Sequence, residues 1–128
     1  MKANFEKKFD NSYSYFRETQ ILTYLNQRSA PVPMLLKGSA KDKIITMEFV
    51  GENLYDQKNI LSFQNKLVVS LDIIQAVRSI YELGILHYDI ALRNLTSKKI
   101  NNGEGSRLYV IDFSVSTSSI FKLQKPLW

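Results

Sequence analysis

At the beginning of the chain, apolar positions follow first the alternation of a strand and then the spacing of a helix. Residues 5–9 read Phe-Glu-Lys-Lys-Phe, and this short alternation predicts a strand. Polar residues 10–12 offer N-cap chemistry for a helix over residues 12–27. The apolar stripe of that helix consists of Tyr15, Leu22 and Leu25. Prolines within residues 30–33 end the helix, because proline lacks an amide hydrogen and restricts the residue before it.

A hairpin and a long helix follow. Residues 34–37 and 43–50 are predicted strands, and the turn-rich residues 38–42 join them. Residues 51–60 form a polar connector with some helical potential. A long amphipathic helix is predicted over 62–83, and Gly84 supplies its C-terminal stop. The apolar stripe of this helix consists of Leu67, Leu71, Ile74, Val77 and Tyr81.

The rest of the chain predicts a second hairpin. Residues 85–94 are expected to be irregular, and strands over 95–100 and 108–113 pair across the loop 101–105. Residues 114–128 are polar and serine-rich, which predicts a loop. The element order is strand, helix, two strands, helix, two strands. This order predicts an α+β fold in two layers.

Composition excludes several classes of protein. The 128 residues suit one domain, and the absence of cysteine excludes disulfides, thiol nucleophiles and thiolate metal sites. A single histidine, His87, excludes a histidine-rich zinc site. The net charge of +5 favours anionic ligands, but the lysines are scattered, so we expect no specific nucleic-acid binding. No apolar run suits a membrane span or a leader, so a cytoplasmic protein is expected.

The candidate chemistry lies in two short segments. Residues 87–94 read His-Tyr-Asp-Ile-Ala-Leu-Arg-Asn, and residues 111–114 read Ile-Asp-Phe-Ser. These resemble the catalytic loop H-R-D-x-x-x-x-N and the D-F-G motif of the protein kinase superfamily. The resemblance extends to residues 82–87, similar to the end of the helix that leads into that loop. Residues 47–51 resemble the hinge between the two kinase lobes, with Met47 in the gatekeeper position.

The resemblance implies a kinase-like fold and a set of roles. A single domain over 1–128 would comprise a reduced small lobe over 1–50, with antiparallel strands and one helix. Residues 51–128 would form a partial large lobe that carries the catalytic loop and the start of an activation segment. The expected cofactors are ATP and Mg²⁺, and His87 is expected to pack beneath Phe113 as a structural residue.

Each expected site residue has a chemical role. Asp89 would accept or orient the proton of the attacking hydroxyl, and Asn94 and Asp112 would supply the oxygen ligands that Mg²⁺ prefers. Arg93 would reach the transferred phosphate or a substrate hydroxyl, with an exposed loop arginine as the alternative. The adenine is expected to bind the backbone of Glu48 and Val50.

Glu18 calls for a partner, because it lies on the apolar stripe of its helix, where an unpaired carboxylate is costly to bury. By resemblance it is the ion-pairing glutamate of the small lobe, and its partner is the lysine that grips nucleotide phosphates. Lys7 is the favoured partner, because it alternates with Phe5 and Phe9 on the apolar side of its strand. Lys2 and Lys8 remain alternatives: Lys2 has a spacing closer to many kinases, and Lys8 faces the polar side.

The sequence departs from the kinase pattern at three points. It has no G-x-G-x-x-G loop over the phosphates and no room for the strands that carry one. Ser114 stands where D-F-G has glycine, which permits backbone angles that serine resists. The chain stops at Trp128, where an activation segment would be ending, so most of the large lobe is expected to be missing and a partner chain is a candidate to complete it.

The sequence therefore predicts transfer of the ATP γ-phosphate to a hydroxyl acceptor, in preference on a protein. Three alternatives remain. One is a pseudokinase or truncated module that holds nucleotide or a partner without turnover. Another is a small-molecule kinase of the aminoglycoside phosphotransferase type. The last is a basic α+β domain that binds nucleic acid, with an accidental motif.

Overall fold

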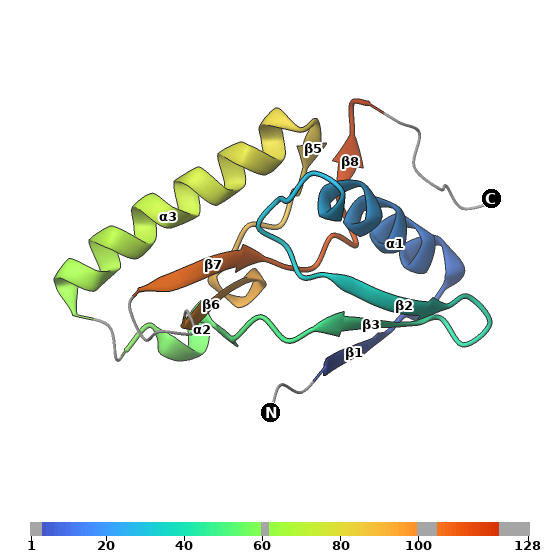
Figure 1. Cartoon of the computed structure of the whole chain (residues 1–128), viewed down its shortest axis with the longest axis horizontal. Coiled ribbons are helices and arrows are strands. Elements are labelled where there is room, and N and C mark those ends of the chain that lie inside the picture. Colours follow the sequence, from blue (N-terminus) through green and yellow to red (C-terminus); the bar gives the residue numbers. More distant parts are fainter. Residues whose placement is uncertain (1–3, 60–61, 100–104, 121–128) are drawn as a thin grey trace.

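The first half of the chain forms a three-stranded sheet with one helix packed on it. The computed structural model describes residues 4–59, 62–99 and 105–120. Strands β1 (Asn4–Lys8), β2 (Leu35–Ser39) and β3 (Ile44–Glu48) pair antiparallel in the order β1-β3-β2. Helix α1 (Ser12–Asn26) contacts β2 and β3 (Figure 1).

Local sequence explains why α1 begins at Ser12 and which face it buries. Its N-cap, Asn11, accepts a hydrogen bond from the Ser14 amide at 2.8 Å. The expected stripe is confirmed and is wider than predicted. The buried face consists of Tyr15, Glu18, Ile21, Leu22 and Leu25. A carboxylate thus lies among side chains that are otherwise apolar or aromatic.

The second half contains a second antiparallel sheet and the long helix. Strands β4, β6 and β7 pair in the order β4-β6-β7, and a separate short pair joins β5 to β8. Helix α3 lies along β7 (Figure 1). The elements of this half are β4 (Glu52–Asn53), α2 (Leu54–Gln57), α3 (Phe63–Glu82), β5 (Ile85–Leu86), the 3₁₀-helix η1 (Leu92–Asn94), β6 (Leu95–Lys99), β7 (Ser106–Val110) and β8 (Thr117–Ser118).

Two sequence predictions need correction in this half. Residues 85–94 were expected to be irregular, but they contain β5 and η1. The connector 51–60 has the helical potential expected of it, as α2, which follows the short strand β4. The segment 114–128 was expected to be loop throughout, but Thr117 and Ser118 pair with Leu86 and Ile85 as β8. Such two-residue strands carry no alternation, so pattern cannot find them. Residues 121–128 lie outside the described residues.

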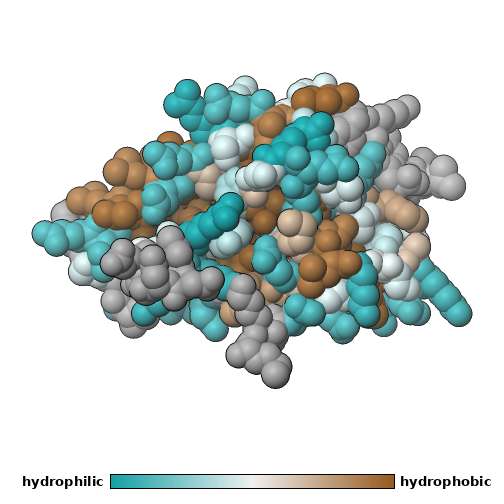
Figure 2. Space-filling view, viewed as in Figure 1, coloured by the Kyte–Doolittle hydropathy of each residue, from teal (hydrophilic) through white to brown (hydrophobic). Residues whose placement is uncertain are grey.

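The orientation of α3 is also different from the prediction. Leu67, Leu71, Ile74 and Tyr81, which were expected to face the core, are 53, 63, 61 and 62% exposed. The face that packs inward carries Ala76 and Ile80 as buried residues and Val69 and Ile73 as partly buried ones. The helix has two apolar stripes at helical spacing, so periodicity alone cannot choose between them. Figure 2 shows hydrophobic residues gathered along the part of the surface that α3 occupies.

One continuous core joins the two halves. The buried cluster includes Ile21 and Ile45 from the first half and Leu95, Val110 and Phe113 from the second. The Val110 amide donates to the Pro31 carbonyl at 2.8 Å. The Tyr24 hydroxyl donates to the Leu83 carbonyl at 2.6 Å. These contacts fix the two sheets relative to each other, which positions the residues between them.

No helix within the described part of the chain is both long and apolar enough to cross a membrane.

The orientation of α3 predicts opposite results for one substitution made at two positions. Ile80→Ala, at a residue 2% exposed, should lower the free energy of unfolding by about 2–4 kcal/mol, because it leaves a cavity. Ile74→Ala, at a residue 61% exposed, should change it by less than about 0.5 kcal/mol. Urea denaturation of both variants measures the difference. Equal losses, or a larger loss at Ile74, would mean that the helix is rotated.

Candidate active site

A cleft lies between the first sheet and the second sheet, and residues 47–53, which connect the two sheets, line it as well. Its volume is about 390 Å³, within the range of small-molecule sites. It brings together six of the eight candidate residues. These are Lys7, Glu18, Glu48, Val50, Asn94 and Asp112.

Lys7 lies between two carboxylates. Its Nζ is 2.9 Å from Glu18 Oε1 and 3.2 Å from Asp112 Oδ1. Lys7 is therefore the partner of Glu18, as the alternation within its strand predicted. Lys8 is exposed, and Lys2 lies outside the described residues. Through these bonds, the ammonium of Lys7 on β1 links Glu18 of α1 to Asp112, which follows β7.

Glu18 is the most deeply buried charged residue of the described chain, at 1% exposure. Its Oε1 also accepts a hydrogen bond from the Phe113 amide at 3.0 Å. Burial raises the pKa of Glu18, while the positive charge of Lys7 and the Phe113 amide oppose that rise. Because burial dominates, the contribution of Glu18 to stability is greatest when it is protonated and falls as pH rises through its pKa.

Asp112 lies in a tight turn that its own side chain stabilises. Its φ is +63°, a left-handed conformation that few residues other than glycine adopt. Its Oδ1 accepts from the Ser114 amide at 3.2 Å and the Ser114 hydroxyl at 2.7 Å. Burial acts to raise the pKa of Asp112, but these two hydrogen bonds and Lys7 outweigh it, so the pKa lies below its ordinary value. Asp112 is therefore ionised at neutral pH.

Residues of the candidate catalytic loop form a second hydrogen-bonded group beside the cleft. Asn94 Nδ2 donates to the Asp89 carbonyl at 2.9 Å and to Asp89 Oδ2 at 3.0 Å. Arg93 Nη2 donates to Asp89 Oδ1 at 2.7 Å. Asp89 and Arg93 do not line the cleft themselves. Asn94 does, and it connects the Asp89 carboxylate to the cleft.

His87 holds this loop in place through hydrogen bonds of both its ring nitrogens. Its Nε2 lies 2.8 Å from the Ile111 carbonyl, and its Nδ1 accepts from the Asp89 amide at 3.1 Å. These partners assign the neutral tautomer with the hydrogen on Nε2. The ring meets Phe113 edge to face at 4.9 Å, so the expected packing of His87 against Phe113 is confirmed. Tyr88, between His87 and Asp89, has a φ of +69°, and the bond from the Asp89 amide to His87 Nδ1 closes this strained turn.

The hinge-like segment forms the other end of the cleft. Met47 is buried at 5% exposure, and Phe49 and Gly51 join Glu48 and Val50 in the lining. Thr96 Oγ1 donates to the Val50 carbonyl at 2.7 Å. The amide hydrogen is therefore the backbone group that Val50 can offer a ligand.

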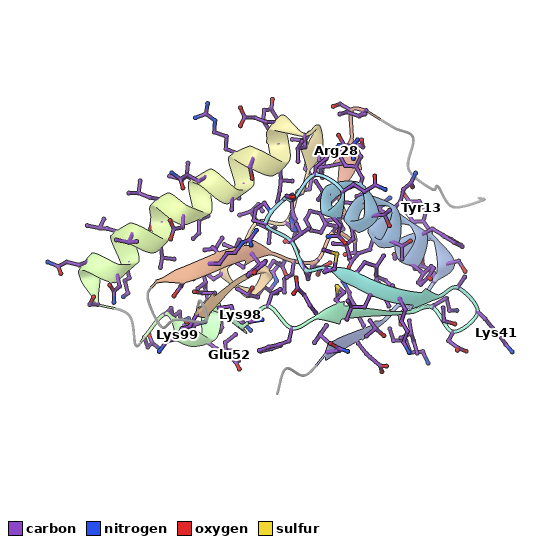
Figure 3. The ribbon with its side chains drawn as sticks, in the orientation of Figure 1. Tyr13, Arg28, Lys41, Glu52, Lys98 and Lys99 are labelled. Atoms are coloured by element: carbon purple, nitrogen blue, oxygen red, sulfur yellow. The ribbon has the colours of Figure 1, made fainter. Side chains whose placement is uncertain are left out.

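Side chains from the second sheet also reach this end of the cleft. Lys98 Nζ donates to the Phe49 carbonyl at 3.1 Å. Lys98 and Glu52 lie near each other on the paired strands β6 and β4 in Figure 3. Lys41 lies far from them, at the turn between β2 and β3.

The donor set of the cleft fits magnesium. Asn94 commits its Nδ2 to Asp89, which leaves the Oδ1 of its amide as a cation ligand. Asp112 supplies an anionic oxygen from the adjacent segment. Mg²⁺ binds through one or two protein oxygens and completes its shell with water and phosphate oxygens. No cluster of three or more histidine, cysteine or acidic residues suited to a metal occurs among the described residues.

Sequence reasoning missed one residue that shapes the site. Arg17, next to Glu18 on α1, donates from Nη1 to the Ser114 carbonyl at 2.7 Å. Its guanidinium also stacks 4.1 Å from the centre of the Tyr13 ring, and burial lowers its pKa. The bond to Ser114 spans 97 positions of sequence, so no local pattern reveals it. Adjacent residues of α1 thus hold this segment at the Phe113 amide and at the Ser114 carbonyl.

Comparison with known proteins identifies proteins of similar sequence. The sequence pattern of the RIO domain family matches residues 4–121. The KEOPS complex subunit Bud32 of Pyrococcus abyssi is 27% identical over 101 residues, covering 78% of this chain and 43% of Bud32. A dual serine/threonine and tyrosine protein kinase of Takifugu rubripes is 34% identical over 68 residues, covering 52% of this chain and 7% of the kinase. The chain therefore spans less than half the length of each relative.

Removal of the Lys7 charge should destabilise the protein, because Glu18 would then be buried without its partner. Lys7→Met should lower the free energy of unfolding at pH 7 by about 3 kcal/mol, because a buried carboxylate loses its partner. The loss should shrink as pH falls, because the pKa of Glu18, already raised by burial, rises further without Lys7. Urea denaturation between pH 4 and 8 measures both effects.

Two further variants control this experiment. Lys8→Met removes the exposed neighbour and should change stability by less than about 0.5 kcal/mol. The double variant Lys7→Met/Glu18→Gln should recover part of the loss, because the orphaned charge is gone. A loss at Lys8 equal to that at Lys7, or a loss independent of pH, would contradict the burial argument.

Proposed function

This chain belongs to the RIO domain family, an atypical protein kinase-like family, and we propose that it transfers the γ-phosphate of ATP to a hydroxyl acceptor. The kinase resemblance and the reduced kinase-like α+β fold inferred from the sequence are confirmed by this membership. The observation that carries the proposal is the position of Lys7. Its ammonium lies within 3.2 Å of both Glu18 and Asp112, in a cleft that Asn94 also lines.

Nucleotide binding would use both ends of the cleft. The adenine contacts the backbone of Glu48 and Val50, beside the apolar side chains of Met47 and Phe49. Lys7 binds the phosphates, and Glu18 keeps it pointed into the cleft through the 2.9 Å ion pair. Mg²⁺, held by Asn94 Oδ1 and Asp112, neutralises phosphate charge when it is bound.

The transfer step would use Asp89. The acceptor oxygen attacks the γ-phosphorus, the bond to the β–γ bridging oxygen breaks, and ADP leaves with that electron pair. The proton of the acceptor hydroxyl passes to the Asp89 carboxylate. Asn94 and Arg93 hold that carboxylate from both sides at 3.0 and 2.7 Å, so they fix the direction from which it receives the proton. Arg93 also places positive charge at the position the acceptor must approach.

A protein is the proposed acceptor, because the catalytic-loop pattern resembles protein kinases and one matching relative carries that name. A protein partner is also proposed, since Bud32 is named as a subunit of a complex. We further propose that residues 1–128 act as one kinase-like domain, because a continuous core joins the two halves.

Ligand-dependent stability tests the nucleotide site. Mg·ATP at 100 times its dissociation constant should stabilise the protein by about 2.7 kcal/mol, a rise of several degrees in Tm. Asp112→Asn should abolish most of this shift, because it removes the anionic metal ligand. Asp10→Asn makes the same chemical change at an exposed site and should leave the shift intact. No shift in the folded wild-type protein would contradict nucleotide binding.

Transfer itself is tested separately from binding. Asp89→Asn should lower the rate of phosphate transfer from labelled ATP to casein or to water by at least about 100-fold, because the proton acceptor is lost. The same variant should keep the thermal shift with Mg·ATP, because Asp89 lies outside the cleft. Wild-type protein that binds Mg·ATP without transfer would favour the alternative of a nucleotide-binding module. An unchanged rate in Asp89→Asn would refute the role of Asp89.

A further inference from the structure

The two oxygens of the Asp112 carboxylate have unequal surroundings. Oδ1 accepts three hydrogen bonds, from the Ser114 hydroxyl at 2.7 Å, the Ser114 amide at 3.2 Å and Lys7 Nζ at 3.2 Å. Among the described residues, none donates a hydrogen bond to Oδ2. Because Oδ1 is surrounded by donors, a cation can approach this carboxylate only through Oδ2.

The Ser114 hydroxyl makes the shortest of the three bonds, and the backbone around it is held in place. Arg17 Nη1 binds the Ser114 carbonyl at 2.7 Å, and Glu18 Oε1 accepts from the Phe113 amide at 3.0 Å. Ser114 itself has no positive φ. The residue of this turn with left-handed backbone is Asp112. A serine therefore fits without the strain that the loss of glycine from D-F-G predicted. Its hydroxyl is directed at one carboxylate oxygen by a fixed backbone.

We propose that Ser114 is a positioning residue that restricts Asp112 to coordination of a cation through one oxygen, and so selects Mg²⁺ over Ca²⁺. This inference rests on the proposed function. Mg²⁺ requires a small octahedral shell at about 2.0–2.1 Å, whereas Ca²⁺ takes six to eight oxygens and readily binds both oxygens of a carboxylate. A carboxylate with one oxygen engaged by Ser114 and Lys7 suits the first ion and disfavours the second.

Removal of the hydroxyl should change ion selectivity rather than nucleotide binding. Calorimetric titration would measure the Kd of ATP with Mg²⁺, with Ca²⁺ and with EDTA, for wild-type protein and Ser114→Ala. In Ser114→Ala, the Kd with Mg²⁺ should rise by about 10-fold, as is usual when a partner of a metal ligand is lost. The Kd with Ca²⁺ should stay the same or fall, and binding in EDTA should not change. The preference for Mg²⁺ should therefore fall by about 10-fold or more.

Three companion variants separate positioning from folding. Ser114→Thr keeps the hydroxyl and should keep the wild-type preference. Ser114→Gly also lacks the hydroxyl but restores the D-F-G glycine, so it tests the inference even if Ser114→Ala folds poorly. Ser70→Ala removes an exposed hydroxyl on α3, which binds the Lys66 carbonyl, and should behave as wild type.

An unchanged Mg²⁺ preference in both Ser114→Ala and Ser114→Gly would overturn the inference. Equal weakening with Mg²⁺, Ca²⁺ and EDTA would also overturn it, because the serine would then support nucleotide binding in general. Wild-type protein that binds ATP without any dependence on the cation would contradict the proposed metal site itself, and the inference about Ser114 with it.

Discussion

The arrangement of the site depends on the burial of one carboxylate. Glu18 is 1% exposed, and its oxygens take hydrogen bonds from the Lys7 ammonium and the Phe113 amide. An ionised carboxylate removed from water is tolerable only with such partners. Helix α1 therefore cannot pack on the first sheet without drawing β1 and the segment after β7 to the same point. The packing of α1 on the first sheet and the geometry of the cleft therefore depend on the same contacts of Glu18.

The candidate catalytic loop, residues 87–94, is held by a separate set of hydrogen bonds. Tyr88 and Asp112, two of the non-glycine residues with a positive φ, lie beside residues that His87 contacts. The His87 ring binds the Asp89 amide and the Ile111 carbonyl. The Ile111 amide in turn donates to the Asn94 carbonyl at 2.9 Å. A neutral imidazole ties together the two segments that carry the candidate chemistry. Strain at functional positions persists only where the surroundings over-determine it, and this network does so.

The sequence predicted the parts of this architecture that depend on short-range pattern. A carboxylate on an apolar stripe indicated that Glu18 would be buried and paired, and alternation along the strand selected Lys7. The spacing of Asp89, Asn94 and Asp112 indicated the site through its resemblance to kinases. The face of α3 could not be predicted, because both of its stripes are apolar and only contact with β7 decides between them. The hydrogen bonds of Arg17 and of the Ser114 hydroxyl were not predicted, because they depend on how the folded chain brings these residues together.

The strand order β1-β3-β2 places Lys7 on an outer strand of the described sheet. Such a strand presents backbone donors and acceptors on one side, which invites pairing with another chain and aggregation. In β1, Glu6 and Lys8 are exposed and flank Lys7 with charges. Charged residues on an outer strand discourage this kind of pairing. The exposed charges of Glu6 and Lys8 thus also favour solubility. They keep the strand that carries Lys7 from acting as a template for aggregation.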